Sequence, residues 1–184
     1  MTPQKAPMNF VENLRRSARQ YTGYTRPACD KEQAVPRCEL AVVTCMDARI
    51  DVYALLGLEE RQAHVIRNAG GVVTADVRRS LTVSQRELRT RRILLIHHTC
   101  CGLKGGDDDE FKDRIEREVG MRPEWALEAF TDEAEDVRQS ARRIAADPFI
   151  PHKNEIYGFV LDVDARELRP VDLDVRRRDE VPVG

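Results

Sequence analysis

Hydrophobic and polar positions along the chain predict strands and helices in alternation. Three runs rich in β-branched and aliphatic residues each predict a buried strand, namely "CELAVVTC" at 38–45, "AHVIRNAGG" at 63–71 and "RRILLIHHTCCG" at 91–102. Apolar residues at helical spacing predict helices at 8–21, 74–90 and 123–146, the last as one helix or a helix pair. A run of aspartates at the positive end of a helix dipole predicts another helix at 105–120. Residues 155–173 predict two short strands around a turn near Ala165.

This order of elements predicts an α/β fold. We expect a single domain with a mainly parallel central β-sheet flanked by helices and a C-terminal antiparallel edge strand. The 184 residues suffice for one hydrophobic core. Within it we expect an N-terminal helical arm and connector at 1–37, an α/β core at 38–175 and a loose tail at 176–184.

Charge and composition exclude several classes of partner. The chain has 30 lysines and arginines against 32 acidic residues, a net charge of -2, so no strongly basic face for nucleic acid is expected. No apolar run approaches the roughly 20 residues of a membrane span, so no membrane partner is expected either. The first residues lack the pattern of a secretory signal, which favours a cytoplasmic location.

Five cysteines in a reducing compartment are expected to be free, buried, catalytic or metal-bound. Cys29 and Cys38 match no metal-ligand spacing, and a disulfide between them stays an open alternative. The other three cysteines, with two histidines, lie at the ends of two predicted strands, in "CMDAR" at 45–49 and "HHTCCG" at 97–102. Parallel strands end at the same edge of a sheet, so these two ends should meet there.

One cysteine from the first strand end and a histidine with a cysteine from the second are the donors that a catalytic zinc takes, with the fourth position left for water. His97 alternates with His98 and should face the other side of the sheet, in a packing or surface role. The H-x-x-C spacing selects Cys101 over Cys100, which we expect to be a packing residue beside the site.

Three motifs together resemble the β-class carbonic anhydrases over nearly the whole chain: C-x-D-x-R at 45–49, "VIRNAGG" at 65–71 and "HTCCG" at 98–102. The compact length and the "CMDAR" motif are most similar to the short archaeal and actinobacterial members. The resemblance implies that Cys45, His98 and Cys101 bind Zn²⁺ and that Asp47 and Arg49 form a dyad. It also implies an N-terminal arm packed on a partner subunit, so we expect a homodimer or a higher even oligomer.

The chemistry of such a site follows from its residues. Zinc lowers the pKa of a bound water to about 7 in favourable sites, so we expect zinc-bound hydroxide to convert CO2 reversibly to bicarbonate and a proton. Asp47 would accept the hydroxide proton as a hydrogen bond, and Arg49 would hold Asp47 ionised by a bidentate contact. Gly70 and Gly71 would let the backbone approach the site and leave a narrow apolar substrate pocket.

Other interpretations remain open at this point. Cys45 alone would suit the role of a small buried hydrophobe, and Asp47 with Arg49 would suit a structural ion pair. The same scaffold would also serve a hydrolase of carbonyl sulfide or carbon disulfide. A non-catalytic zinc-binding domain is a further alternative, and it predicts a fourth protein ligand. Whether Asp47 itself becomes a ligand when Arg49 releases it is also open.

Overall fold

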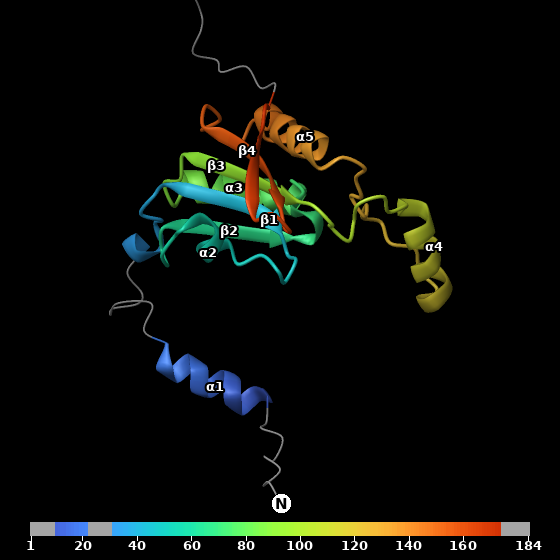
Figure 1. The fold of residues 1–184 in the computed structure, drawn as a ribbon, viewed down its shortest axis with the longest axis horizontal. Helices are drawn as coiled ribbons and strands as arrows, with labels where there is room; N and C mark the ends of the chain where they lie inside the picture. The colour runs from blue at the N-terminus through green and yellow to red at the C-terminus, as the bar shows by residue number, and fades with distance from the viewer. Residues whose placement is uncertain (1–9, 22–30, 174–184) are drawn as a thin grey trace, which may run out of the picture. The chain divides into compact units, whose positions relative to one another are not determined.

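The computed structural model of the chain describes residues 10–21 and 31–173 (Figure 1). The chain divides between Gln33 and Ala34 into two units. The first contains helix α1 (Phe10–Gln20), whose apolar side chains Phe10, Val11 and Leu14 are all exposed. A 3-10 helix, η1 (Lys31–Ala34), spans the boundary between the units. Residues 22–30 of the predicted connector and the predicted tail at 176–184 lie outside the described residues.

The second unit is built on a five-stranded sheet with the order β2-β1-β3-β4-β5. The strands are β1 (Leu40–Cys45), β2 (Ala63–Asn68), β3 (Arg92–His98), β4 (Ile156–Asp162) and β5 (Glu167–Val171). The first four run parallel, and β5 pairs antiparallel with β4. The predicted α/β fold with an antiparallel edge strand is therefore confirmed.

Four helices follow the strands of this unit: α2 (Val52–Leu56), α3 (Ala75–Arg86), α4 (Asp108–Val119) and α5 (Glu133–Ala146). A polar side chain caps the first turn of each by accepting a backbone N–H, from Asp51, Thr74, Asp107 and Asp132 in turn. The residues that end α2 and α4 are Gly57 and Gly120, both in the left-handed conformation that glycine adopts without strain.

One prediction about a helix is corrected, and one helix was missed. Helix α5 begins at Glu133 and not near Pro123, because Asp132 provides its N-cap and the preceding residues run as an irregular segment in which Phe130 bridges to Lys104. Helix α2 was not predicted, because its five residues are too few to show a helical period.

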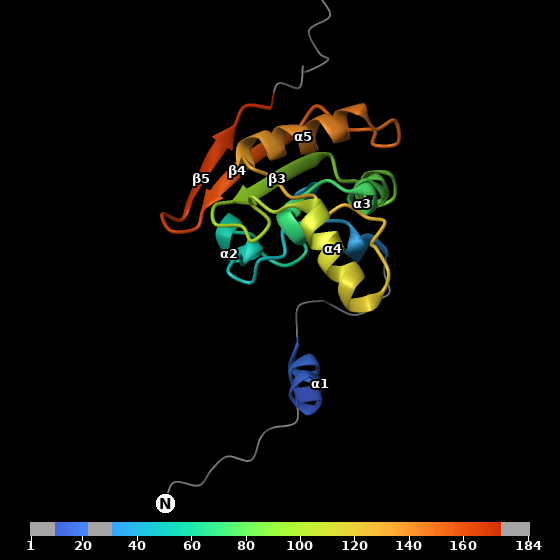
Figure 2. The same ribbon diagram turned by 90° about the vertical axis from the view of Figure 1, so that its right-hand side faces the viewer.

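The helices form layers on the two faces of the sheet. Val77 and Leu81 of α3 and Val137 of α5 pack with inner residues of β1 and β3 in one apolar cluster, and Val52 of α2 belongs to a second cluster on the other face. Figure 2 shows α3 and α5 on one side of the sheet and α2 on the other. Helix α4 has no buried residue and stands off from the sheet (Figure 1).

The carboxyl ends of β1 and β3, which are neighbours in the sheet, lie at the same edge because the two strands are parallel. This pairing brings the residues that follow Thr44 and Ile96 together, although they are far apart in the sequence. None of the helices within the described residues is long and apolar enough to cross a membrane.

Candidate metal centre and active site

Cys45 is the last residue of β1 and is only 5% exposed. The chain leaves the sheet directly after it, and the Met46 N–H donates a last hydrogen bond of 2.8 Å to the carbonyl of Asn68 on β2. Burial alone would raise the pKa of the Cys45 thiol, but contact with His98 and the backbone N–H groups of Asp47 and Gly70 lower that pKa to about 7. The surroundings of Cys45 therefore favour the thiolate, which is the form that binds metals.

Asp47 and Arg49 form a bidentate ion pair immediately after Cys45. The Arg49 Nε and Nη2 groups donate to the two carboxylate oxygens at 3.0 and 2.7 Å, and the Arg49 backbone N–H donates to Oδ1 at 2.9 Å. These contacts hold the pKa of the Asp47 carboxyl well below its usual range. Arg49 Nη2 also donates to the carbonyl of Cys100, so the pair connects the ends of both strands.

His98 ends β3 and is completely buried. Its Nδ1 lies 2.9 Å from the carbonyl of Thr99, which accepts the Nδ1 proton in the tautomer that leaves the Nε2 lone pair free. Nε2 is buried without a hydrogen-bond partner among the described residues, and it lies 3.8 Å from Asp47 Oδ2. Burial alone would lower the pKa of His98, but contact with Cys45 raises it overall.

Cys101 lies in the turn after β3 and is 7% exposed. Burial raises the pKa of its thiol, with a further contribution from the neighbouring Cys45. The Lys104 N–H donates to the Cys101 carbonyl, and the Lys104 ammonium binds both carboxylate oxygens of Glu133 at 2.8 and 2.9 Å. A salt bridge to α5 therefore anchors the turn that carries Cys101.

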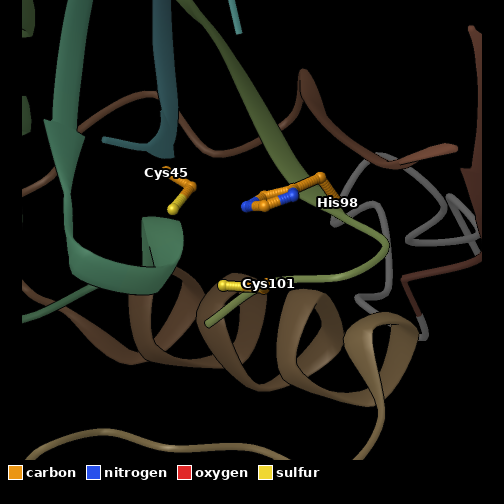
Figure 3. Close-up of side chains that lie close together, drawn as sticks. All are labelled: Cys45, His98 and Cys101. Carbon is orange, nitrogen blue, oxygen red and sulfur yellow. The ribbon is translucent and has the colours of Figure 1, made fainter. Parts of the chain in front are cut away.

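The ligand atoms of Cys45, His98 and Cys101 all lie within 4.8 Å of one another. Figure 3 shows the two sulfur atoms and the imidazole turned toward a common point. Two sulfurs and an imidazole nitrogen are donors that zinc prefers, and a buried nitrogen without a partner is costly unless a ligand supplies one. The three side chains therefore fit a bound metal ion.

Gly70 and Gly71 follow β2 and lie against this cluster. Both have positive φ values, +79° and +74°, which glycine adopts without strain. A Cβ atom on Gly71 would lie only 2.7 Å from the backbone nitrogen of Cys45. The close backbone approach is therefore present at Gly71, whereas the role of both glycines in a substrate pocket stays a prediction.

His97 points to the other face of β3, as its alternation with His98 predicts. It is fully buried, and its Nε2 lies 3.5 Å from Asp136 Oδ2. Its ring packs edge-on against the Phe130 ring, with the two ring centroids 5.3 Å apart. Neither ring nitrogen has a hydrogen-bond partner among the described residues. Burial lowers the pKa of His97 to about 4 and raises the pKa of Asp136 to about 6.

Cys100 is exposed, so the expectation that it packs beside the site is wrong. Its backbone takes a positive φ of 55° in the turn that brings Cys101 inward, and its thiol consequently remains at the surface. Cys38 is a free cysteine, while Cys29 lies outside the described residues.

Two residues that contact the site were not predicted. Arg67 of β2 donates to the carbonyls of Cys45 and Asp47 at 3.0 and 2.7 Å. Thr99 accepts from His98 through its backbone carbonyl. A backbone acceptor has no signal in the residue type, and the contact of Arg67 depends on the register of β1 with β2.

An open α/β sheet that gathers sulfur and nitrogen donors at its carboxyl edge has the architecture of a metal-dependent enzyme. Comparison with known proteins defines the family. The family model for carbonic anhydrase matches residues 40–155. Beta-carbonic anhydrase 1 of Mycobacterium tuberculosis is 54% identical over 136 residues, which cover 74% of this chain and 83% of that protein. The chain belongs to the β-carbonic anhydrase family.

Of two further comparisons, one is with another carbonic anhydrase and one is with a hydrolase. The crystal structure of a carbonic anhydrase from Streptococcus mutans superposes with a TM-score of 0.78 at 33% identity, covering 91% of this chain and all of that one. A carbon disulfide hydrolase of Acidithiobacillus thiooxidans is 28% identical over 172 residues, covering 82% of this chain and 86% of that protein. The similarity therefore extends to a relative that is named for a different substrate.

Proposed function

We propose that the protein catalyses the reversible hydration of CO2 to bicarbonate and a proton, with a zinc ion held by Cys45, His98 and Cys101. The observation that carries the proposal is the convergence of these three donors beside the Asp47–Arg49 pair, in a chain of this family. A bound zinc ion would supply hydroxide near neutral pH by lowering the pKa of water.

The other residues have roles that their contacts support. Asp47 is ionised, and its Oδ2 faces the donor set. The carboxylate is therefore placed to accept a hydrogen bond from the attacking oxygen. Arg49 fixes the orientation of that carboxylate through two parallel hydrogen bonds. Gly71 allows the close approach of the backbone that leaves Cys45 at its position.

Metal analysis and a CO2 hydration assay by stopped flow test the proposal together. The purified protein is expected to contain close to one zinc per chain and to hydrate CO2. Removal of zinc by a chelator should abolish hydration, and readdition should restore it. A zinc-loaded protein that does not hydrate CO2 would contradict the proposal.

Hydrolysis of carbonyl sulfide or carbon disulfide is the second candidate, and the similarity to a carbon disulfide hydrolase favours it. The three motifs do not separate these substrates, because all are linear molecules with an electrophilic carbon. CO2 hydration and release of hydrogen sulfide from each sulfur substrate should be measured on the same zinc-loaded preparation. We expect hydration to exceed hydrolysis, and the reverse order would favour the second candidate.

A purely structural zinc site is the alternative without catalysis. It requires a fourth protein ligand, whereas the candidate cluster among the described residues contains three. Absorption spectra of the cobalt-substituted protein distinguish the two: an open position should bind added anions and change the spectrum, while four protein ligands should leave it unchanged.

We propose a homodimer as the smallest active assembly. Helix α1 exposes the apolar side chains Phe10, Val11 and Leu14. An apolar helix face is normally buried against another surface, and a partner subunit would provide one. Deletion of residues 1–21 is expected to weaken association in analytical ultracentrifugation. A fully active monomer of the whole chain would contradict this proposal. The cytoplasmic location stays a prediction that cell fractionation would test.

A further inference from the structure

Arg67 makes its contacts at the point where β1 ends. It lies on β2 two residues after Val65, on the same face of the strand, and its backbone pairs with Thr44 of β1. Its Nε group donates to the carbonyl of Cys45 at 3.0 Å, and its Nη2 group donates to the carbonyl of Asp47 at 2.7 Å. One guanidinium therefore holds both the residue that carries a candidate metal donor and the residue that carries the candidate proton acceptor.

These two carbonyls lie where regular backbone pairing stops. The Met46 N–H still bonds to Asn68, but the chain then turns away from the sheet. Other hydrogen bonds of Asp47 are local to the loop: its carboxylate accepts from Arg49, and its carbonyl also accepts from the Ile50 N–H at 3.1 Å. Such local bonds shape the loop without fixing it to β2. Arg67 adds two attachments to β2, one on each side of the bond from Met46 to Asn68.

The shape of the guanidinium suits this task better than other cations. Nε–H and one Nη–H of arginine project in parallel from a rigid plane, so two acceptors at a fixed spacing are bound together. Both hydrogen bonds that the structure gives the Arg67 side chain go to backbone carbonyls. Its contacts are thus directed to the backbone of the site and not to a charge partner.

We propose that Arg67 is a positioning residue, which sets the orientation of the Cys45 sulfur and the Asp47 carboxylate together by clamping their carbonyls. This inference rests on the proposed function for its effect on turnover. It also makes a claim about metal retention that does not depend on any activity. Loss of the clamp should let the loop move relative to β2, which displaces both groups at once.

Arg67→Gln is the test variant, and Arg92→Gln is the matched control. Arg92 likewise donates to a backbone carbonyl, that of Cys38, and to a carboxylate, but it lies at the opposite end of the sheet where β3 begins. Zinc content, the rate of zinc transfer to a chelator, kcat at saturating zinc and melting temperature should be measured on both variants. Arg67→Lys, which retains the charge but can bind only one carbonyl in the same geometry, completes the series.

Arg67→Gln is expected to release zinc faster and to lower kcat by about 10- to 100-fold, since a misplacement of about 1 Å costs a factor of this size. Arg67→Lys should fall between this variant and the wild type, and Arg92→Gln should match the wild type in both rates. Wild-type zinc release and kcat in Arg67→Gln would overturn the proposal, as would equal losses in Arg92→Gln.

A double-mutant cycle separates positioning from a general loss of structure. If Arg67 acts on turnover through Asp47, adding Arg67→Gln to Asp47→Asn should lower kcat little further. Independent, multiplicative losses in the double variant would overturn the assignment. If the wild-type protein does not hydrate CO2, the proposed function fails, and the rate of zinc release alone decides whether Arg67 holds the Cys45 loop.

Discussion

His97 and His98 are neighbours on β3 and both are completely buried, yet the two sides of the strand give them different surroundings. His98 has its Nδ1 fixed by the Thr99 carbonyl and its Nε2 aimed at two thiols. His97 has two unpartnered ring nitrogens among the described residues, an aromatic neighbour and a carboxyl group at 3.5 Å. Burial is therefore the same in both cases, and the convergence of further donors is what distinguishes a candidate ligand.

The largest effect is expected from replacing each of the two histidines separately. His98→Ala should weaken zinc binding by at least about 100-fold. Removing a group that only hydrogen-bonds to a metal ligand already lowers metal affinity by about 10- to 100-fold. His97→Phe should retain zinc and hydration, since it lies on the other face. Zinc content after dialysis against a weak chelator measures both.

A matched pair of cysteine variants extends this test to the turn after β3. Cys101→Ser should lose zinc, whereas Cys100→Ser should keep it, because the Cys100 thiol is exposed and outside the cluster. The ligand assignment would be wrong if His97→Phe lost the metal while His98→Ala kept it. It would also be wrong if Cys100→Ser lost the metal while Cys101→Ser kept it.

A smaller effect is expected at the dyad. Asp47→Asn should keep zinc and fold, because the amide has nearly the shape of the carboxylate, but turnover should fall about 10²- to 10⁴-fold with the charged proton acceptor gone. Arg49→Ala should cost a comparable factor. Stopped-flow rates per zinc-loaded molecule, with melting temperatures alongside, measure both variants. Reduced stability with unchanged turnover would instead identify a structural ion pair.

The smallest effect is expected on the His97 side, and it concerns stability. Burial raises the pKa of Asp136 to about 6 from its ordinary 3.8, although the nearby Arg143 opposes the shift and Glu128 and Glu135 add to it. The folded protein thus retains this proton where the unfolded chain has already released it. The contribution of Asp136 to the free energy of unfolding then falls as pH rises from about 4 to 6, by about 1–3 kcal/mol in total.

Asp136→Asn removes that contribution. The stability of the variant relative to the wild type should increase as pH rises through this window and level off above it. Urea unfolding at several pH values measures the difference between the two proteins, both of which retain His97. A difference that stays constant across the window would show that Asp136 is ionised at an ordinary pKa.

The sequence was sufficient for features that a local pattern determines. The β-branched run before Cys45 predicts a strand, and alternation along β3 separates His98 from His97. Local pattern failed where a single residue overrides it. The spacing from Phe130 to Ala134 continues the helical period of α5 backward, but the side chain of Asp132 accepts the Glu135 N–H and starts the helix there.

Features that depend on pairing between strands were out of reach. The contact of Arg67 with the Cys45 loop requires that Thr44 lie opposite Arg67, which is a property of the β1–β2 register. The exposure of Cys100 depends on its left-handed backbone in the turn, which the H-x-x-C spacing does not predict. The candidate donors were predictable, but the residues that hold them in place were not.

The parallel pairing of β1 with β3 also determines when in folding the candidate site can form. Cys45 and His98 end strands that β2 and α3 separate in the sequence, so their approach closes a long loop and is expected late in folding. Metal uptake during refolding should therefore follow the formation of the sheet. A chelating dye that reports free zinc would then time the completion of the native topology, without any probe attached to the protein.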